Sequence, residues 1–171
     1  MARSAETTIR VRPAAAADVP LILTLIRELA EYERLADRVV ATEERLHTHL
    51  FGERPAAEAL IGEVDGRPAG FALFHTSFST FLARPGIWLE DVFVREEHRG
   101  AGLGRALLAE LARIALERGY GRLEWWVLDW NEPAKGFYRS IGAEAMDAWT
   151  VQRLGEEAMH RLADEIAPEA G

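Results

Sequence analysis

One stretch, from Ile87 to Gly104, constrains the fold of this chain more than any other. It reads IWLEDVFVREEHRGAGLG. Its first half is a strand-like apolar run that carries two acidic residues, and its second half is a charged turn followed by a glycine-rich loop. Apolar residues then recur at helical spacing from Leu103 to Ala115, which predicts a helix with one apolar face. A strand, a glycine loop and a helix in this order indicate an α/β fold.

The other segments extend this unit to the order β-α-α-β-β-β-α-β-α-β-α. Apolar spacing and capping residues predict further helices at about 19–32, 42–52, 133–140 and 155–166. Residue preferences and turn signals predict strands at about 9–12, 59–64, 68–75, 87–94, 123–128 and 149–154, with a loop at 76–86. We therefore expect an α/β protein with a mixed sheet and helices on both of its faces.

The chain length predicts one domain over residues 1–171, with residues 1–7 and 167–171 frayed. Five tryptophans fall in or beside the last three predicted strands, and we expect most of them to pack in the core. They are Trp88, Trp125, Trp126, Trp130 and Trp149.

The composition disfavours several classes of function. A net charge of -8 argues against a nucleic-acid partner, which is recognised through clustered Lys and Arg. No apolar run approaches the roughly 20 residues of a membrane helix, and the N-terminus lacks the apolar stretch of a secretory signal, so we expect a cytoplasmic protein without membrane contact. The absence of Cys excludes disulfides and thiolate chemistry. His47 and His49 diverge on a predicted helix, and we expect no metal.

The glycine-rich loop from Arg99 to Arg105 predicts an anion site, because unpaired N–H groups and the helix dipole favour negative charge there. The dinucleotide fingerprint needs Gly where this chain has Arg105, and the phosphate loop of nucleotide hydrolases needs a Gly-Lys-Ser/Thr that is missing. A tight turn that only packs the helix on the sheet is the alternative for the loop taken alone.

A second motif runs from Asn131 to Tyr138 and is followed by Gly142 and Ala143. The loop and this motif resemble the Arg/Gln-x-x-Gly-x-Gly/Ala and Asn-x-x-Ala-x-x-Phe-Tyr-x-x-x-Gly patterns of the GNAT superfamily of N-acetyltransferases. A narrower resemblance is to its diamine and polyamine branch, which includes spermidine/spermine and thialysine acetylases. The segments that carry it are RPAAAADVPLILTLIRELAEYE, LFGERP, LEDVFVREEHRGAGLG and WNEPAKGFYRSIGA.

The resemblance implies a GNAT-type, mostly antiparallel sheet, acetyl-CoA as the acetyl donor, a small primary amine as acceptor, and a homodimer. It places CoA on the strand from Val92, on the glycine loop and on the second motif, with the backbone N–H of Phe93 or Val94 as the oxyanion donor. The implied cofactor residues are Val92, Phe93, Val94, Arg99, Gly100, Ala101, Gly102, Leu103, Gly104, Arg105, Asn131, Glu132, Pro133, Ala134 and Tyr138.

Acetyl transfer from a thioester to an amine needs a base, an oxyanion donor and an acid. An amine with a pKa near 10.4 is neutral in only about 1 molecule in 10³ near pH 7.4. Deprotonation at this pH therefore costs roughly 4 kcal/mol of free energy. In a regular strand Glu90 and Asp91 would point to opposite faces, so we expect one carboxylate to be partly buried with a raised pKa. The resemblance selects Glu90 as the base, acting directly or through a water, and Tyr138 as the acid that protonates the thiolate.

The resemblance also implies the residues that contact the acceptor. They are Tyr32, Glu33, Glu90, Asp91, Glu124, Trp125, Trp126 and Asp147. Carboxylates beside aromatic rings suit an alkylammonium chain, although solvated helix-end charges and core tryptophans are the alternatives. The segment TSFSTFLARPG lacks the acidic residue that the spermidine enzymes carry there, which favours a shorter amine such as an amino acid with a side-chain amine.

Other functions stay open at this point. The fold could serve a CoA-binding sensor without catalysis, the acceptor could be a peptide or protein, and a nicotinamide-dependent oxidoreductase is a third class. The presence of both Glu90 and Tyr138 favours the enzyme.

Overall fold

A computed structural model gives the structure of residues 7–164. The chain forms two compact units, one that ends at Trp126 and one that begins at Val127. The prediction that both termini are frayed falls mainly outside the described residues, and the single domain over 1–171 stays a prediction.

A five-stranded sheet organises the first unit, with the strands in sequence order. The first four strands are antiparallel, and the last joins its neighbour in parallel. They are β1 (Ile9–Pro13), β2 (Glu58–Val64), β3 (Arg67–Ser79), β4 (Arg84–Val94) and β5 (Leu123–Trp125). The predicted mixed, mostly antiparallel sheet is confirmed.

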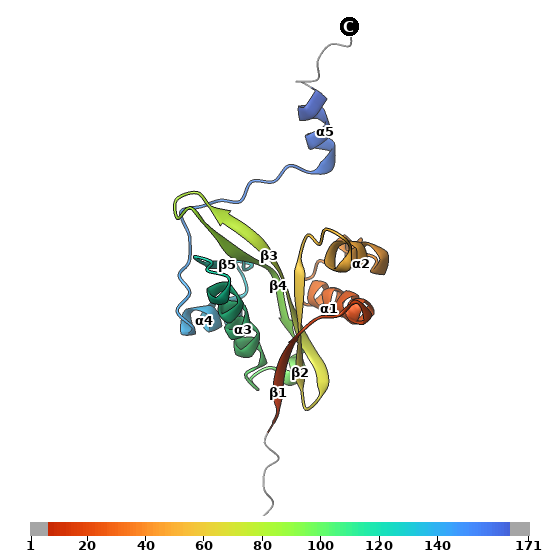
Figure 1. Ribbon diagram of the computed structural model, residues 1–171, viewed down its shortest axis with the longest axis vertical. Coiled ribbons are helices and arrows are strands. Elements are labelled where there is room, and N and C mark those ends of the chain that lie inside the picture. Colours follow the sequence, from red (N-terminus) through yellow and green to blue (C-terminus); the bar gives the residue numbers. More distant parts are fainter. Residues whose placement is uncertain (1–6, 165–171) are drawn as a thin grey trace, which may run out of the picture. The chain divides into compact units, whose positions relative to one another are not determined.

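Three α-helices cover the sheet of this unit: α1 (Val19–Tyr32), α2 (Glu43–Phe51) and α3 (Leu103–Glu117). Figure 1 views the sheet nearly edge-on, with α1 and α2 on one side and α3 on the other. Short 3-10 turns at Ala16–Asp18, Ala36–Arg38 and Glu96–His98 connect these elements. Thr42 caps α2 by accepting a hydrogen bond from the Arg45 N–H, as the sequence predicted for this residue.

The core has two layers because both faces of the sheet are covered. Ile22 and Leu25 of α1 pack with Ile61, Phe71 and Phe93 on one face. On the other face α3 contributes three side chains that are almost fully buried, Leu103, Leu107 and Leu111. Burial of such a side chain stabilises the fold by about 1.5–3 kcal/mol. The apolar spacing predicted α1 and α3 well because the apolar side chains of each helix are the ones that it buries against the sheet.

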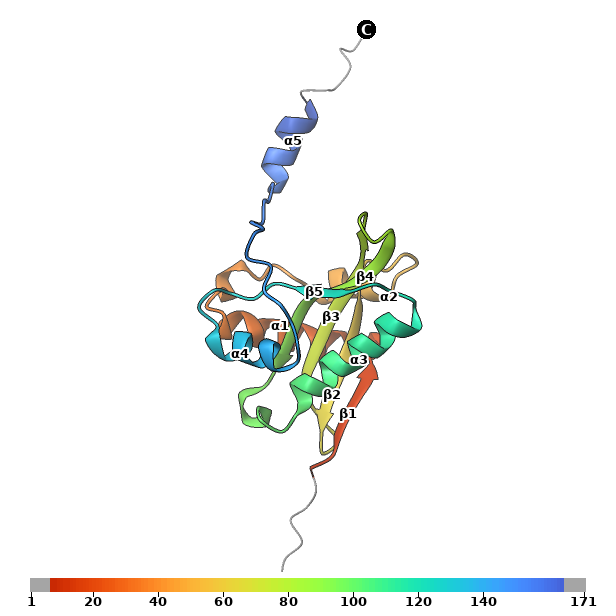
Figure 2. The same ribbon diagram turned by 90° about the vertical axis from the view of Figure 1, so that its left-hand side faces the viewer.

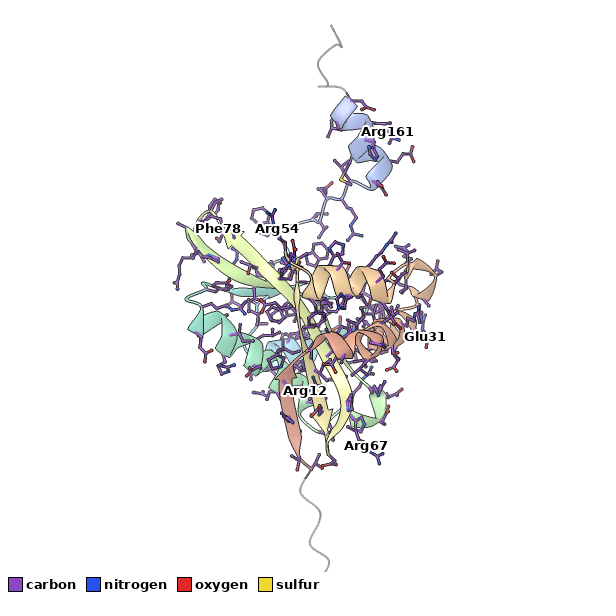
Figure 3. All side chains as sticks on the ribbon, turned by 45° about the vertical axis from the view of Figure 1, so that its right-hand side comes forward. Arg12, Glu31, Arg54, Arg67, Phe78 and Arg161 are labelled. Atoms are coloured by element: carbon purple, nitrogen blue, oxygen red, sulfur yellow. The ribbon has the colours of Figure 1, made fainter. Side chains whose placement is uncertain are left out.

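The loop predicted at 76–86 is wrong. β3 continues to Ser79 and β4 begins at Arg84, with paired residues from Thr76 opposite Ile87 to Ser79 opposite Arg84. Figure 2 shows this hairpin extending past the ends of the neighbouring strands, and Figure 3 places Phe78 near its tip. Backbone hydrogen bonds between the two strands hold this part of the hairpin, and Phe78 is exposed. The segment therefore lacks the pattern of buried apolar residues from which a strand is predicted.

The strand predicted at 149–154 is also wrong, and the one at 123–128 ends at Trp125. The second unit has two helices, α4 (Glu132–Ser140) and α5 (Glu156–Asp164), and no strand among its described residues. The aromatic and β-branched residues Trp149, Thr150 and Val151 favour a strand, but a strand also needs a neighbour to bond its backbone. The helix predicted at 155–166 is confirmed over 156–164, and residues 165 and 166 lie outside the described part.

The tryptophans do not form the core. Trp88 and Trp125 are half-buried, while Trp126 (53% exposed), Trp130 and Trp149 (74%) are exposed. Aliphatic side chains and three phenylalanines fill the core instead, and these are Phe71, Phe74 and Phe93. Within residues 7–164 no helix has the length and apolar character needed to cross a membrane.

Candidate active site

A β-bulge at Glu90 interrupts β4. Leu89 pairs with Phe74 and Asp91 pairs with Leu73, so Glu90 is an extra residue between two regular pairs. Bulges bend a strand and change the direction of its side chains, and they are frequent beside active sites.

The bulge places both acidic side chains of β4 on one face. Trp88 lies opposite His75 and Asp91 lies opposite Leu73, and these two partners are two residues apart on β3. The Trp88 indole Nε1–H donates to Glu90 Oε2 at 3.2 Å, which puts Glu90 on this face as well. The expectation that Glu90 and Asp91 point to opposite faces is therefore wrong, because the extra residue shifts the alternation.

Three carboxylates gather near this face. Burial raises the pKa of Asp91 to about 6, and the negative charges of Glu90 and Glu33 add to that increase. Glu33 follows the last residue of α1, and burial raises its pKa too. A partly buried group of acids favours a positively charged ligand, which would restore the ionised form of Asp91. Among residues 7–164, no group of three or more His, Asp or Glu side chains is placed to hold a metal ion.

Replacing Asp91 by Asn is expected to stabilise the fold at neutral pH by about 1–3 kcal/mol. Because the folded-state pKa is raised from 3.8 to about 6, the folded state keeps this proton up to a higher pH than the unfolded state does. The unfolding free energy of the parent should fall as pH rises from about 4 to about 6 and stay low above that window. Denaturant titrations across this range measure it.

The fall should be smaller in the Asp91→Asn variant, since its amide has no proton to lose and only other carboxylates, such as Glu33, still contribute. The exposed Asp37→Asn variant is the control and should follow the parent. Parallel profiles for the parent and Asp91→Asn would contradict the assignment.

Arg99 joins the glycine loop to the end of α1. Its guanidinium carbon lies 4.5 Å from the ring centroid of Tyr32 and 5.8 Å from that of Phe93. Its Nε donates to the carbonyl oxygen of Val94 at 3.0 Å. The sequence places an arginine in this loop but does not predict the cation–π contact, because the contact joins two segments far apart in the chain.

The glycine loop turns the chain sharply into α3. Gly100 and Gly102 have φ values of 80° and 99°, a left-handed conformation that glycine adopts without strain. Gly102 is the N-cap of α3, and the Ala106 N–H bonds back to its carbonyl oxygen. The N–H groups of residues 103–105 therefore precede the first helical hydrogen bond and remain available to an anion.

Replacing Gly102 by Val should raise about tenfold the KM for acetyl-CoA, the donor that the resemblance implies. A side chain in the left-handed conformation costs roughly 1–2 kcal/mol, and relief of that strain would shift the N–H groups that begin α3. Steady-state kinetics with varied acetyl-CoA measures the effect. Gly119, with φ of 69° at the other end of α3, gives the matched control Gly119→Val. Equal changes of KM in the two variants would refute an anion site at the loop.

One edge of β4 is only partly paired. β5 pairs with Ile87, Trp88 and Leu89 alone, so among the described residues no strand pairs with Val92–Val94 on that side. An extended ligand chain can bond to such an edge as an additional strand would. The predicted cofactor residues Val92, Phe93 and Val94 thus lie beside the loop that Arg99 begins.

Two predicted acceptor residues, Glu124 and Trp125, lie in β5 and take opposite faces, and a third, Trp126, follows the strand. Glu124 lies opposite Trp88 and forms an ion pair with Arg122 at 2.6 Å. The Trp126 ring makes an edge contact with Trp88, with 5.1 Å between centroids. Trp125 lies opposite the buried Leu89 and therefore takes the face away from Glu90.

The second unit carries the other motif. The Asn131 side chain caps α4 by accepting from the Ala134 N–H at 3.3 Å, and Pro133 stands in the first turn. Glu132 forms an ion pair with Lys135 at 2.7 Å. Tyr138 is half-buried, with its ring 5.5 Å from that of Phe137, and Asp147 is exposed in a turn. The roles predicted for these residues stay predictions.

Comparison with known proteins decides the family. The model of the acetyltransferase (GNAT) family matches residues 24–143, which include the bulge, the loop and the second motif. The chain belongs to the GNAT family. It is therefore an acetyltransferase, and enzymes of this family use acetyl-CoA as co-substrate.

Its relatives within the GNAT family match over most of the chain. A thialysine N-epsilon-acetyltransferase from Bos taurus is 39% identical over 166 residues, covering 91% of this chain and 97% of the relative. An L-ornithine N5-acetyltransferase from Arabidopsis thaliana is 32% identical over 198 residues, covering 90% and 87%. A spermidine/spermine N(1)-acetyltransferase-like protein from Homo sapiens is 29% identical over 164 residues, which is 90% of this chain but 24% of that protein.

Solved structures support the GNAT fold. An integron cassette protein from V. cholerae has a TM-score of 0.75 at 25% identity, covering 91% of this chain and 97% of that one. An aminoglycoside acetyltransferase from a soil metagenome has a TM-score of 0.72 at 17% identity, covering 86% and 97%. The second likeness shows the fold alone.

Proposed function

We propose that this enzyme transfers the acetyl group of acetyl-CoA to the side-chain amine of a small diamino acid, such as thialysine or ornithine. The observation that carries the proposal is the acidic face at the β4 bulge, where Glu33, Glu90 and Asp91 lie close to one another. A diamino acid brings a second ammonium group, which a partly buried carboxylate such as Asp91 would bind.

The relatives support a short acceptor. The bovine and Arabidopsis relatives are named for thialysine and ornithine, both amino acids with a side-chain amine, and both match nearly full length. The hairpin segment 76–86 also has no acidic residue to bind the far end of a long polyamine. Diamines and polyamines are therefore expected to be poorer acceptors.

Glu90 is proposed to take the proton of the acceptor ammonium, directly or through a water, as the amine attacks the thioester carbon. The backbone N–H of Phe93 or Val94 would donate to the carbonyl oxygen as it gains charge. Tyr138 would give its proton to the departing sulfur when the C–S bond breaks. The products are the acetylated amine and free CoA, with one proton released overall.

Residues 92–94 and the loop up to Arg105 are proposed to hold the donor, together with residues 131–134 of the second motif. The N–H groups at the start of α3 would bind its phosphates. Tyr32, next to Arg99, would line the acceptor side, where its ring suits an alkylammonium chain.

A panel of amines tests this proposal through the release of free CoA thiol. We expect thialysine and ornithine to exceed spermidine in kcat/KM by about tenfold or more, a difference of roughly 1.4 kcal/mol in transition-state binding. A higher kcat/KM for spermidine would contradict the proposed diamino acid and indicate a polyamine as the acceptor. Activity on peptides alone would indicate a protein N-acetyltransferase, and binding of acetyl-CoA with no thiol release from any amine would indicate a sensor.

A further inference from the structure

We propose that Trp88 is a positioning residue that holds the carboxylate of Glu90 for catalysis. The inference rests on the proposed function, in which Glu90 is the base. The indole Nε1–H of Trp88 donates to Glu90 Oε2 at 3.2 Å, from two residues earlier on the same strand. Neither the family match nor the relatives assign a role to this side chain.

Glu90 needs such a partner because of where it lies. It is exposed, and the bulge leaves it between two regular pairs of the β3–β4 ladder. A free glutamate side chain at such a position samples several rotamers, and freezing it costs up to about 2 kcal/mol. A base must instead sit within hydrogen-bond reach of the proton that it takes.

The bond suits a general base. The indole N–H is a donor only, and an ionised carboxylate is an acceptor only, so the pair forms without a competing proton transfer. It engages Oε2 and leaves Oε1 for the ammonium or for a bridging water. In this proposal Trp88 acts through the direction of the Glu90 carboxylate, and not through a contact of its own with the acceptor.

The Trp88 ring is itself held in place. Its neighbour Trp126 packs against it edge-on, with an interplanar angle of 79°. Trp88 is half-buried rather than part of the core, and it shares its face of the sheet with Glu90 and Asp91. A side chain that served packing alone would not need its N–H. Removal of the N–H therefore distinguishes a packing role of Trp88 from the positioning of Glu90.

Two substitutions separate the donor from the bulk of the ring. Trp88→Phe keeps an aromatic ring but removes the N–H. Trp88→His loses the six-membered ring but keeps a ring nitrogen, because Nε2 of imidazole occupies the place of Nε1 in indole when the five-membered rings coincide. We expect kcat to fall about tenfold in Trp88→Phe, with KM for both substrates within about twofold of the parent, and Trp88→His to recover part of that loss.

A double-mutant cycle with Glu90→Gln tests whether Trp88 acts through Glu90. In the Glu90→Gln background, Trp88→Phe should change kcat by less than about twofold. Thermal melting and the KM for acetyl-CoA establish that each variant is folded, and the exposed Trp149→Phe variant is the control.

The possible failures are distinguishable. A tenfold loss from Trp88→Phe in both backgrounds, or no loss in either, overturns the positioning role while Glu90 remains the base. A better rate for Trp88→Phe than for Trp88→His also overturns it, since bulk would then matter more than the donor. A Glu90→Gln variant with the kcat of the parent instead refutes the base and the proposed mechanism with it.

Discussion

Replacing Glu90 by Gln should lower kcat for acetyl transfer by about 10²–10³-fold, within the range that a positioned general base contributes. The amide is close in size to the carboxylate but cannot take a proton from the ammonium. Because the substitution impairs only the deprotonation of the amine, the KM for acetyl-CoA should stay near that of the parent. Initial rates of thiol release at saturating concentrations of both substrates measure the effect.

The pH dependence of this variant adds a second readout. Without the base, the rate should keep rising as pH approaches the ordinary pKa of an alkylamine, near 10.4, because only the neutral amine reacts. Glu31→Gln is a suitable control, since Glu31 is an exposed residue near the end of α1 (Figure 3). A kcat within about threefold of the parent would mean that another group accepts the proton.

Replacing Gly70 by Ala should lower the unfolding free energy by about 3 kcal/mol, at the upper end of the usual cost of overpacking. A Cβ at this position would lie 2.4 Å from the carbonyl oxygen of Phe93 and 3.2 Å from Cα of Val94. Both atoms belong to the backbone of β4, so the two strands would have to move apart. For a chain of this length the thermal midpoint should fall by roughly 6–12 °C.

The displacement would also reach the proposed oxyanion donors, so the activity of folded Gly70→Ala should fall as well. Gly155→Ala is the matched control, because a Cβ there meets no atom within 4 Å. A thermal midpoint for Gly70→Ala within about 2 °C of the parent would contradict the close approach of β3 and β4 at this pair.

The sequence predicted the elements whose pattern is local. The apolar spacing of α1 and α3 matches the side chains that the sheet buries, and Gly102 has the left-handed conformation that a sharp turn into a helix needs. Asn131 caps α4, as its place before Pro133 suggests.

Features that depend on pairing between distant segments could not be predicted in this way. The bulge at Glu90 follows from the register between β3 and β4, so an argument from regular alternation gave the wrong face for one carboxylate. The two adjacent acids in an apolar strand were a signal that the alternation could fail there. Residue preferences also predicted a strand near Trp149, although no described strand pairs with it. The homodimer, the cytoplasmic location and the catalytic role of Tyr138 stay predictions.

The central claim is the transfer of an acetyl group to a side-chain amine of a small amino acid. Its most direct test incubates the enzyme with acetyl-CoA and thialysine, and measures free thiol and the mass and fragmentation of the amine in the same sample. The expected result is one acetyl group on the side-chain amine for each thiol released. Thiol release without an acetylated amine, or acetylation of the α-amine instead, would contradict it.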